Sequence, residues 1–66
     1  MKHKVCDEFN INNYVILNFK ELPTSPYKRV KIDGIIYDIV PSYDMENCVV
    51  INSQSTFLGK EVEFVI

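Results

Sequence analysis

The chain has 66 residues and a formal net charge of −2, and 47% of its residues are hydrophobic. That length suits a single domain, residues 1–66, and the hydrophobic fraction is typical of a folded chain rather than a disordered one. The small negative charge argues against a strongly basic nucleic-acid-binding protein. Val and Ile dominate the apolar residues and Ala is absent, which favours strands over helices.

The N-terminal residues have no features of a secretory signal. Met1–Lys4 is charged, no apolar core follows it, and no later apolar run approaches the length of a transmembrane helix. We therefore expect a cytoplasmic protein in which Cys6 and Cys48 are reduced and unlinked.

In the first stretch, residues 2–9, successive side chains would lie on opposite faces of a strand. As a short edge strand it would place Val5, Asp7 and Phe9 together on one side. Residues 1–12 are equally compatible with a frayed terminus.

A better-defined strand is predicted over residues 14–19. Asn residues before it predict a turn, because Asn tolerates the left-handed backbone region. Val15, Leu17 and Phe19 share one face of this strand, and the opposite face is also largely apolar. We therefore expect both faces to be well covered.

Residues 20–27 are predicted to form a loop. Pro23 and Pro26 cannot donate ladder hydrogen bonds, so neither suits the interior of a sheet. The loop is long enough to pack across an open end of the sheet, with Leu22 or Tyr27 as its plug.

Asp33-Gly34 is the strongest local signal in the chain. It lies between two apolar-rich runs and suits a two-residue type I′ turn, in which both central residues take a positive φ. A two-residue loop fixes the strand register. The predicted pairs are Lys28 with Ile39, Arg29 with Asp38, Val30 with Tyr37, Lys31 with Ile36, and Ile32 with Ile35.

Alternation gives this hairpin an apolar face and a mixed face. The predicted core face carries Val30, Ile32, Ile35, Tyr37 and Ile39. The opposite face combines the charged residues Arg29, Lys31 and Asp38 with Ile36 and Val40. These two aliphatic side chains do not suit a solvent-facing surface, so we expect a loop or a partner to cover them.

The C-terminal part contains two more predicted strands, over residues 48–52 and 60–66. A polar, acidic loop over 41–47 precedes the first of them. Between the strands, residues 53–59 predict one turn of 3₁₀ helix that ends at Gly59 in a positive φ. In the last strand Val62, Phe64 and Ile66 are predicted to point inward, and Val65 breaks the alternation.

Five or six short strands with turns between them predict an all-β fold, a small and mainly antiparallel barrel. The single short helical turn before the last strand is similar to the arrangement in SH3-like or OB-like barrels, an analogy of topology that carries no function. The alternative is an open twisted sheet that a second copy completes, because small open sheets expose strand edges.

The residues give little support for catalysis or cofactor binding. His3 is the only histidine, and no pattern places it against Cys6 or Cys48 as a nucleophile pair. There is no C-x-x-C spacing for zinc, and both glycines are already assigned to turns, so no phosphate-binding loop is expected. We predict a protein that is not an enzyme and has no cofactor or metal.

One candidate surface would contact nucleic acid. Lys28, Arg29 and Lys31 could neutralise phosphates while the neighbouring Tyr27 and Tyr37 stack on bases. The register weakens this hypothesis, because Tyr37 belongs to the opposite face and Asp38 lies across from Arg29.

A second candidate surface would contact protein. Tyr27 lies on one long loop, and Tyr43 and Met45 lie on the other, so they would meet if both loops close the same end of the barrel. Tyr and Met are enriched at interfaces. Together with Ile36 and Val40 they make the predicted partner surface, the alternative being that they simply cap the barrel.

From these observations the preferred hypothesis is a non-enzymatic cytoplasmic binding or assembly module. It would act through a protein partner or a second copy of itself. The alternative is a barrel that binds single-stranded nucleic acid through Lys28, Arg29 and Lys31, and no membrane association is expected.

Overall fold

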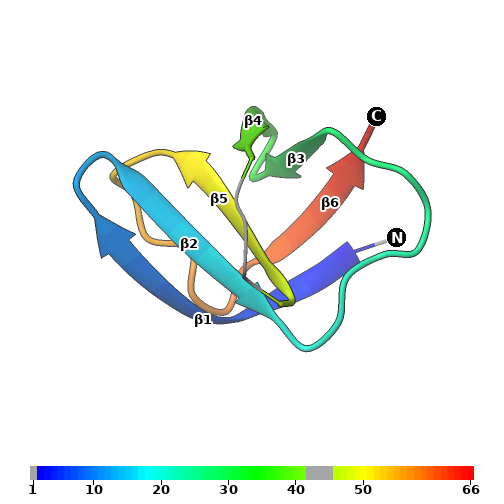
Figure 1. The fold of residues 1–66 in the computed structure, drawn as a ribbon, viewed down its shortest axis with the longest axis horizontal. Helices are drawn as coiled ribbons and strands as arrows, with labels where there is room; N and C mark the ends of the chain where they lie inside the picture. The colour runs from blue at the N-terminus through cyan, green and yellow to red at the C-terminus, as the bar shows by residue number, and fades with distance from the viewer. Residues whose placement is uncertain (1, 42–45) are drawn as a thin grey trace.

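The computed structural model describes residues 2–41 and 46–66, and these residues form an all-β fold without helices. Six antiparallel strands make one closed, barrel-like ring (Figure 1). The strands are β1 (Lys2–Ile11), β2 (Tyr14–Phe19), β3 (Arg29–Ile32), β4 (Ile35–Val40), β5 (Cys48–Asn52) and β6 (Glu61–Val65). The predicted fold class is confirmed, and the N-terminal stretch is a paired strand of ten residues rather than a frayed end.

The ring runs in the order β1-β2-β5-β4-β3-β6 and closes where β6 pairs with β1. Strands β1 and β4 each change neighbour along their length. β1 pairs with β6 near its start and with β2 from Val5 onward, while β4 pairs first with β3 and then with β5. The open sheet considered as an alternative is therefore wrong, because no neighbouring pair in the ring is left unjoined.

The β3–β4 hairpin has the predicted register and turn. Arg29 pairs with Asp38 and Ile32 with Ile35, and both turn residues have positive φ angles, 52° at Asp33 and 82° at Gly34. Because Asp and Gly are the residue types that tolerate this backbone, the local sequence determines the turn.

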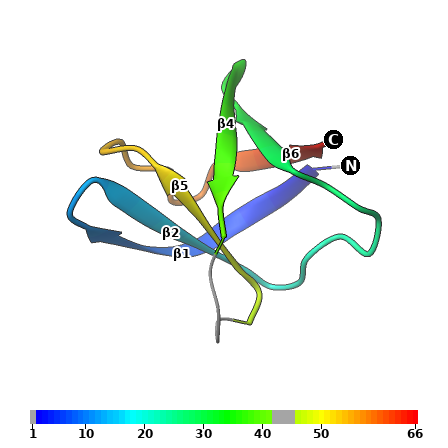
Figure 2. The same ribbon diagram turned by 45° about the horizontal axis from the view of Figure 1, so that its top comes forward.

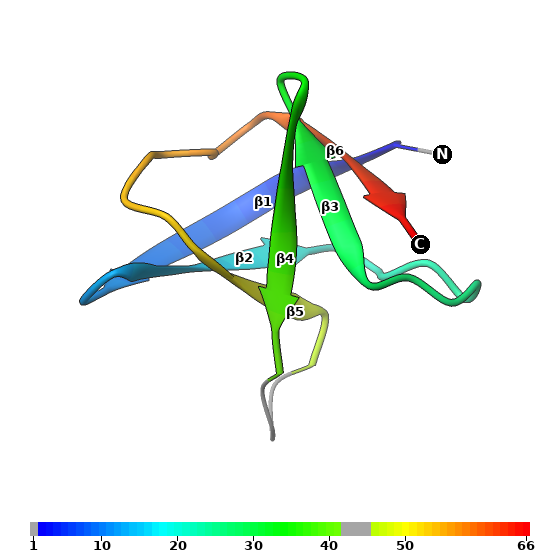
Figure 3. The ribbon, with the colours of Figure 1, turned by 90° about the horizontal axis from the view of Figure 1, so that it is seen from above.

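For one residue of this hairpin, Ile35, the predicted position in the core is wrong. Val30 and Ile32 are buried, but Ile35 is 56% exposed. The turn projects beyond the rest of the barrel (Figures 2 and 3), so alternation still directs Ile35 toward the inner side while no strand covers it there. Whether a side chain is buried therefore depends on which strands of the ring cover it, as well as on the alternation along its own strand.

A β-bulge in β1 changes which side chains face the core. Val5 pairs with Phe19 and Asp7 with Asn18, which leaves Cys6 as an extra residue between them. Beyond the bulge the alternation is inverted, so Phe9 points outward. The prediction that Phe9 shares the face of Val5 is therefore wrong.

The core fills the inside of the ring. Its buried side chains are Val5, Val15, Leu17, Phe19, Val30, Ile32, Val49, Ile51, Phe57 and Val62. Leu22 and Tyr27 pack against this core, as the predicted plug requires, together with Tyr37, Ile39 and Phe64. Ile66, predicted to point inward, is exposed because β6 ends at Val65.

A reverse turn precedes β6. The Lys60 N–H donates to the Phe57 carbonyl (2.9 Å), and Gly59 has the predicted positive φ, 81°. The predicted 3₁₀ turn over 53–59 is not confirmed, because none of these residues is assigned to a helix.

Candidate functional site

The outer surface of the barrel carries a row of apolar side chains that crosses four strands. Phe9 on β1 pairs with Ile16 on β2, Ile16 pairs with Val50 on β5, and Val50 pairs with Val40 on β4. Paired residues point to the same side of a sheet, and the alternating neighbours Val15 and Leu17 fill the core, so this row faces outward. We refer to these four residues as the apolar row.

Two further side chains widen the apolar row toward the β1–β2 turn. Ile11 pairs with Tyr14, one two-residue step along from the pair of Phe9 and Ile16. Phe9, Ile11 and Tyr14 are 55%, 52% and 40% exposed, whereas Val50 at the middle of the row is 8% exposed. The apolar face, meaning the row together with Ile11 and Tyr14, is therefore exposed to solvent at β1 and at the start of β2, and buried at Val50 on β5.

The surroundings of the apolar face are nearly free of charge. Asn18 and Cys48 form the next pair along β2 and β5, and the Asn18 Nδ2 donates to the Cys48 Sγ (3.2 Å). Asn52 lies opposite Tyr14 at the other end. Of the outward positions on β1, β2 and β5 in this sheet, Asp7 is the only charged one, and on β4 the exposed Asp38 lies one two-residue step from Val40.

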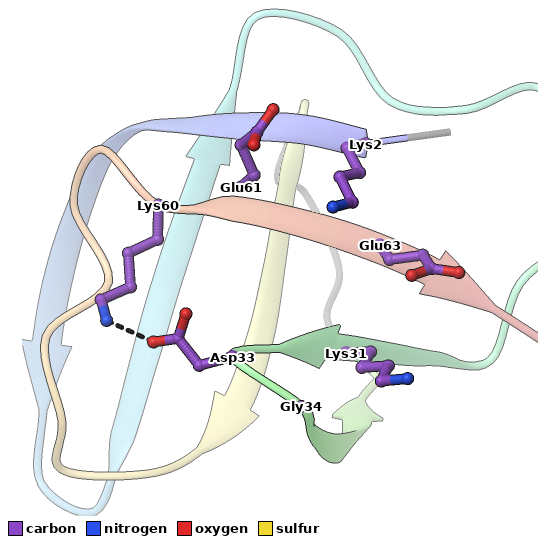
Figure 4. Close-up of a pocket in the computed structure, with 7 residues that line it drawn as sticks. All are labelled: Lys2, Lys31, Asp33, Gly34, Lys60, Glu61 and Glu63. Atoms are coloured by element: carbon purple, nitrogen blue, oxygen red, sulfur yellow. Dashed lines mark hydrogen bonds and ion pairs between the residues drawn. The ribbon is translucent and has the colours of Figure 1, made fainter.

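The other outer surface, over β1, β6 and β3, is charged. Lys2 and Lys31 lie on either side of Glu63, and Lys4 lies opposite Glu61. A hollow of about 370 Å³ lies here (Figure 4), and Lys60 forms an ion pair with Asp33 beside it. Opposite charges alternate along this surface, so it carries no concentrated patch of one sign.

The predicted nucleic-acid residues do not converge on one basic surface. Lys31 lies beside Glu63, and the Arg29 guanidinium donates to the Ile66 carbonyl (2.7 Å). Lys28 shares the alternation of Val30 and therefore projects to the other side of the strand from Arg29.

The aromatic residues of that hypothesis face inward. Tyr27 packs edge-on against Phe64 at a centroid distance of 4.8 Å, and Tyr37 packs against Phe57 at 5.6 Å. Both are half-buried against the core. The hypothesis needs exposed aromatic rings beside cations, so that bases can stack while phosphates are neutralised. The described residues do not form such a surface.

The predicted partner surface divides into separate regions. Val40 belongs to the apolar row, Ile36 is exposed on the β3–β4 hairpin, and Tyr27 packs on Phe64. Tyr43 and Met45 lie outside the described residues. Ile36 and Val40 are four residues apart on one strand, about 13 Å at strand spacing, so they do not form a single patch.

His3 and Cys6 line the same hollow, about 340 Å³, beside Phe19. The imidazole is packed edge-on by Phe19 and Phe64, and its Nδ1 is buried without a hydrogen-bond partner among the described residues. Cys48 lies instead on the outer surface beside Asn18. Over residues 2–41 and 46–66, no three His, Cys, Asp or Glu side chains group as metal ligands.

The sequence reasoning missed Phe9 and Ile11 as surface residues because the bulge at Cys6 has no clear local signature. A partial signal existed in the strand 14–19, whose two faces are both apolar although only one can face a small core. In β5, Val50 gives the same signal, because it is apolar and lies on the face opposite the core residues Val49 and Ile51. A strand with two apolar faces in a barrel of this size is therefore a sequence signal for an apolar outer surface.

No protein-family model matches the chain, and no curated protein or solved structure matches it significantly. Neither described part of the chain contains a helix with the length and apolarity that a membrane crossing requires.

Proposed function

We propose that this protein is a non-enzymatic binding or assembly module that acts through the apolar face. Its partner is a protein surface, either another protein or a second copy of the chain. The observation that carries the proposal is the apolar row, which crosses four strands on the outside of a closed ring.

The energetic argument starts from the exposure of Phe9. An aromatic side chain has roughly 200 Å² of surface, so burying its exposed half contributes about 2.5 kcal/mol at about 25 cal/mol per Å². Ile11 and Tyr14 contribute in the same way. Part of this gain is lost to the entropy of association, but a contiguous patch of this kind is typical of an interaction site.

Two further observations support the same proposal. The chain has one histidine, whose imidazole is packed edge-on by Phe19 and Phe64, and the Cys6 Sγ in the same hollow donates to the Lys4 carbonyl. Cys6 and Cys48 are unpaired thiols, which suits the reducing environment of the cytoplasm. We propose the cytoplasm as its location.

Site-specific photo-cross-linking tests this function. A photoreactive phenylalanine analogue placed at Tyr14 or Phe9, in the cells that produce the protein, should give discrete protein adducts on illumination. The same analogue at Lys2, on the charged surface, is the matched control and should give few. The adduct from position 14 should disappear when Ile11→Lys is added, because a buried ammonium has no partner on this face.

The contrary result would be equal cross-linking from Tyr14 and Lys2, or no adduct from either face position. Either outcome would show that the apolar face is not in contact with protein.

A further inference from the structure

The first half of β4 has a strand beside it on one edge only. Residues 35–38 pair with β3 on one side, but on the other side β5 pairs only with Ile39 and Val40. Among the residues that the structure describes, no strand pairs with residues 35–38 on this second side. We call this side of residues 35–38 the β4 edge.

The hydrogen bonds of the hairpin show which backbone groups point to the β4 edge. The Ile39 N–H donates to the Lys28 carbonyl across the hairpin, at 3.4 Å. Bonding directions alternate along an antiparallel strand, so Tyr37 and Ile35 also direct their backbone groups toward β3. Ile36 and Asp38 direct theirs the other way. The N–H and C=O of Ile36 therefore point to the β4 edge, where no strand receives them.

The β4 edge is accessible from solvent. Ile35 and Ile36 are 56% and 57% exposed, and the turn next to them projects beyond the barrel (Figures 2 and 3). Proteins usually protect such an edge with a lysine, a proline or a bulge, because unpaired backbone groups are a template for another chain. Residues 35–38 contain neither lysine nor proline, and their pairing with β3 is regular.

β1 also has a free edge, beyond the point where β6 leaves it, but that edge is protected. β6 pairs with β1 only at Lys2, His3 and Lys4, and the bulge at Cys6 follows directly. The Glu8 N–H then donates to Oδ1 of the neighbouring Asp7 carboxylate, at 2.9 Å. The β4 edge is therefore the better template of the two.

We infer that the β4 edge binds an extended segment of a partner protein, which adds to β4 as an antiparallel strand. This inference goes beyond the proposed function, because the apolar face meets β4 only at Val40. The added strand would exchange backbone hydrogen bonds with Ile36. Residues 34–38 are about 13 Å long at strand spacing, so about five residues of the partner can take part.

The inner side of the β4 edge is apolar. Ile35 and Tyr37 share this side, and Phe57 packs against Tyr37 at a centroid distance of 5.6 Å. Leu58, the next residue in the connection before β6, is 58% exposed. The residues of the added strand that lie opposite Ile35 and Tyr37 should therefore be aliphatic, and β-branched ones suit a strand best.

The outer side of the β4 edge selects a cation. Asp38 lies opposite Arg29, but the Arg29 guanidinium donates to the Ile66 carbonyl instead. Within the described residues the one ion pair is that of Lys60 with Asp33, so the Asp38 carboxylate is left for a partner. A lysine or arginine opposite Asp38 supplies it. A second copy of β4 fits less well, because it would bring the same carboxylates to the edge.

The first experiment titrates the isotope-labelled chain with the peptide acetyl-Lys-Val-Thr-Val-Thr-amide and follows the amide NMR spectrum. The lysine would lie opposite Asp38 and the central threonine opposite Ile36. The Ile36 amide proton should shift downfield as its hydrogen bond forms, with a dissociation constant of about 100 µM to 1 mM, the weak end of the affinity scale.

Two methylated peptides test the strand geometry. A methyl group on the nitrogen of the central threonine removes the N–H that bonds to the Ile36 carbonyl, so this peptide should bind at least about fivefold more weakly. The matched control carries the methyl group on the nitrogen of the valine after that threonine. Its N–H points away from β4, so its affinity should be unchanged.

Three variants of the chain test the same contact from the other side. Ile36→Pro removes the N–H at the edge and should weaken binding about fivefold or more. Asp38→Lys keeps the backbone and should weaken it about threefold or more, so it serves if Ile36→Pro does not fold. Glu61→Lys, the same change of charge on the exposed start of β6, should bind as the unsubstituted chain does.

Each contrary outcome is distinct. An Ile36 amide that does not move at about 1 mM peptide, or equal affinity of the two methylated peptides, would overturn the inference. An Ile36 amide that shifts with the concentration of the chain alone would show that a second copy occupies the edge, and would overturn the stated occupant. Photo-cross-linking from Phe9 and Tyr14 tests the apolar face separately, so either contact can fail without the other.

Discussion

At the scale of single residues, the bulge at Cys6 determines what Glu8 does. The inverted alternation directs Glu8 toward the inner side, where its Oε1 accepts a hydrogen bond from the Phe57 N–H (2.7 Å). Phe57 is a buried core residue in the connection before β6. A single half-buried carboxylate therefore ties the β5–β6 connection to β1.

We expect Glu8→Ala to destabilise the fold by about 1.5 kcal/mol, because it leaves the partly buried Phe57 N–H without an acceptor. Glu8→Gln keeps an acceptor oxygen and should cost less. Asp7→Ala is the control, since among the described residues the Asp7 carboxylate accepts only a solvent-exposed hydrogen bond, from the N–H of Glu8. Urea unfolding monitored by tyrosine fluorescence measures the differences, and equal costs for Glu8→Ala and Asp7→Ala would contradict the assigned role.

At the scale of elements, the hairpin was predictable and the bulge was not. Asp33-Gly34 determines its own turn and register through backbone preferences that act within four residues. The bulge depends on β1 turning from β6 to β2, which is a property of the closed ring. For that reason Val40 was identified from its position in β4, whereas Phe9 was assigned to the wrong face.

Deletion of Cys6 tests the element directly. Removing the extra residue makes Val5 and Asp7 neighbours, so regular alternation keeps Glu8 inward and Phe9 outward, but β1 loses the bend with which it turns from β6 to β2. We expect a loss of about 3 kcal/mol, the upper end of ordinary destabilising changes, because the ring must strain to stay closed. Cys6→Ser keeps the extra residue on the exposed bulge and should change stability by less than about 0.5 kcal/mol. A deletion variant as stable as Cys6→Ser would show that the bulge is unimportant.

At the scale of the whole molecule, the two outer surfaces of the barrel differ in the forces they can use. One carries Lys2, Lys31, Glu61 and Glu63 in alternating sign, and the other carries the apolar face with Asp7 at its margin. Contacts through the charged surface weaken as salt rises, since exposed charges are screened over about 10 Å at 0.1 M salt. Contacts through the apolar face are not screened, so ionic strength identifies which surface associates.

We therefore expect the dissociation constant for the protein contact made through the apolar face to change by less than about threefold between 50 and 500 mM sodium chloride, because no ion pair is proposed at that face. Sodium sulfate, which strengthens apolar burial, should tighten association. Lys31→Glu should have no effect on the constant, whereas Ile11→Lys should abolish association in every salt. Binding through Lys28, Arg29 and Lys31 to a single-stranded oligonucleotide would behave in the opposite way and weaken steeply with salt. A protein contact whose affinity weakened about tenfold over this range would be assigned to the charged surface instead.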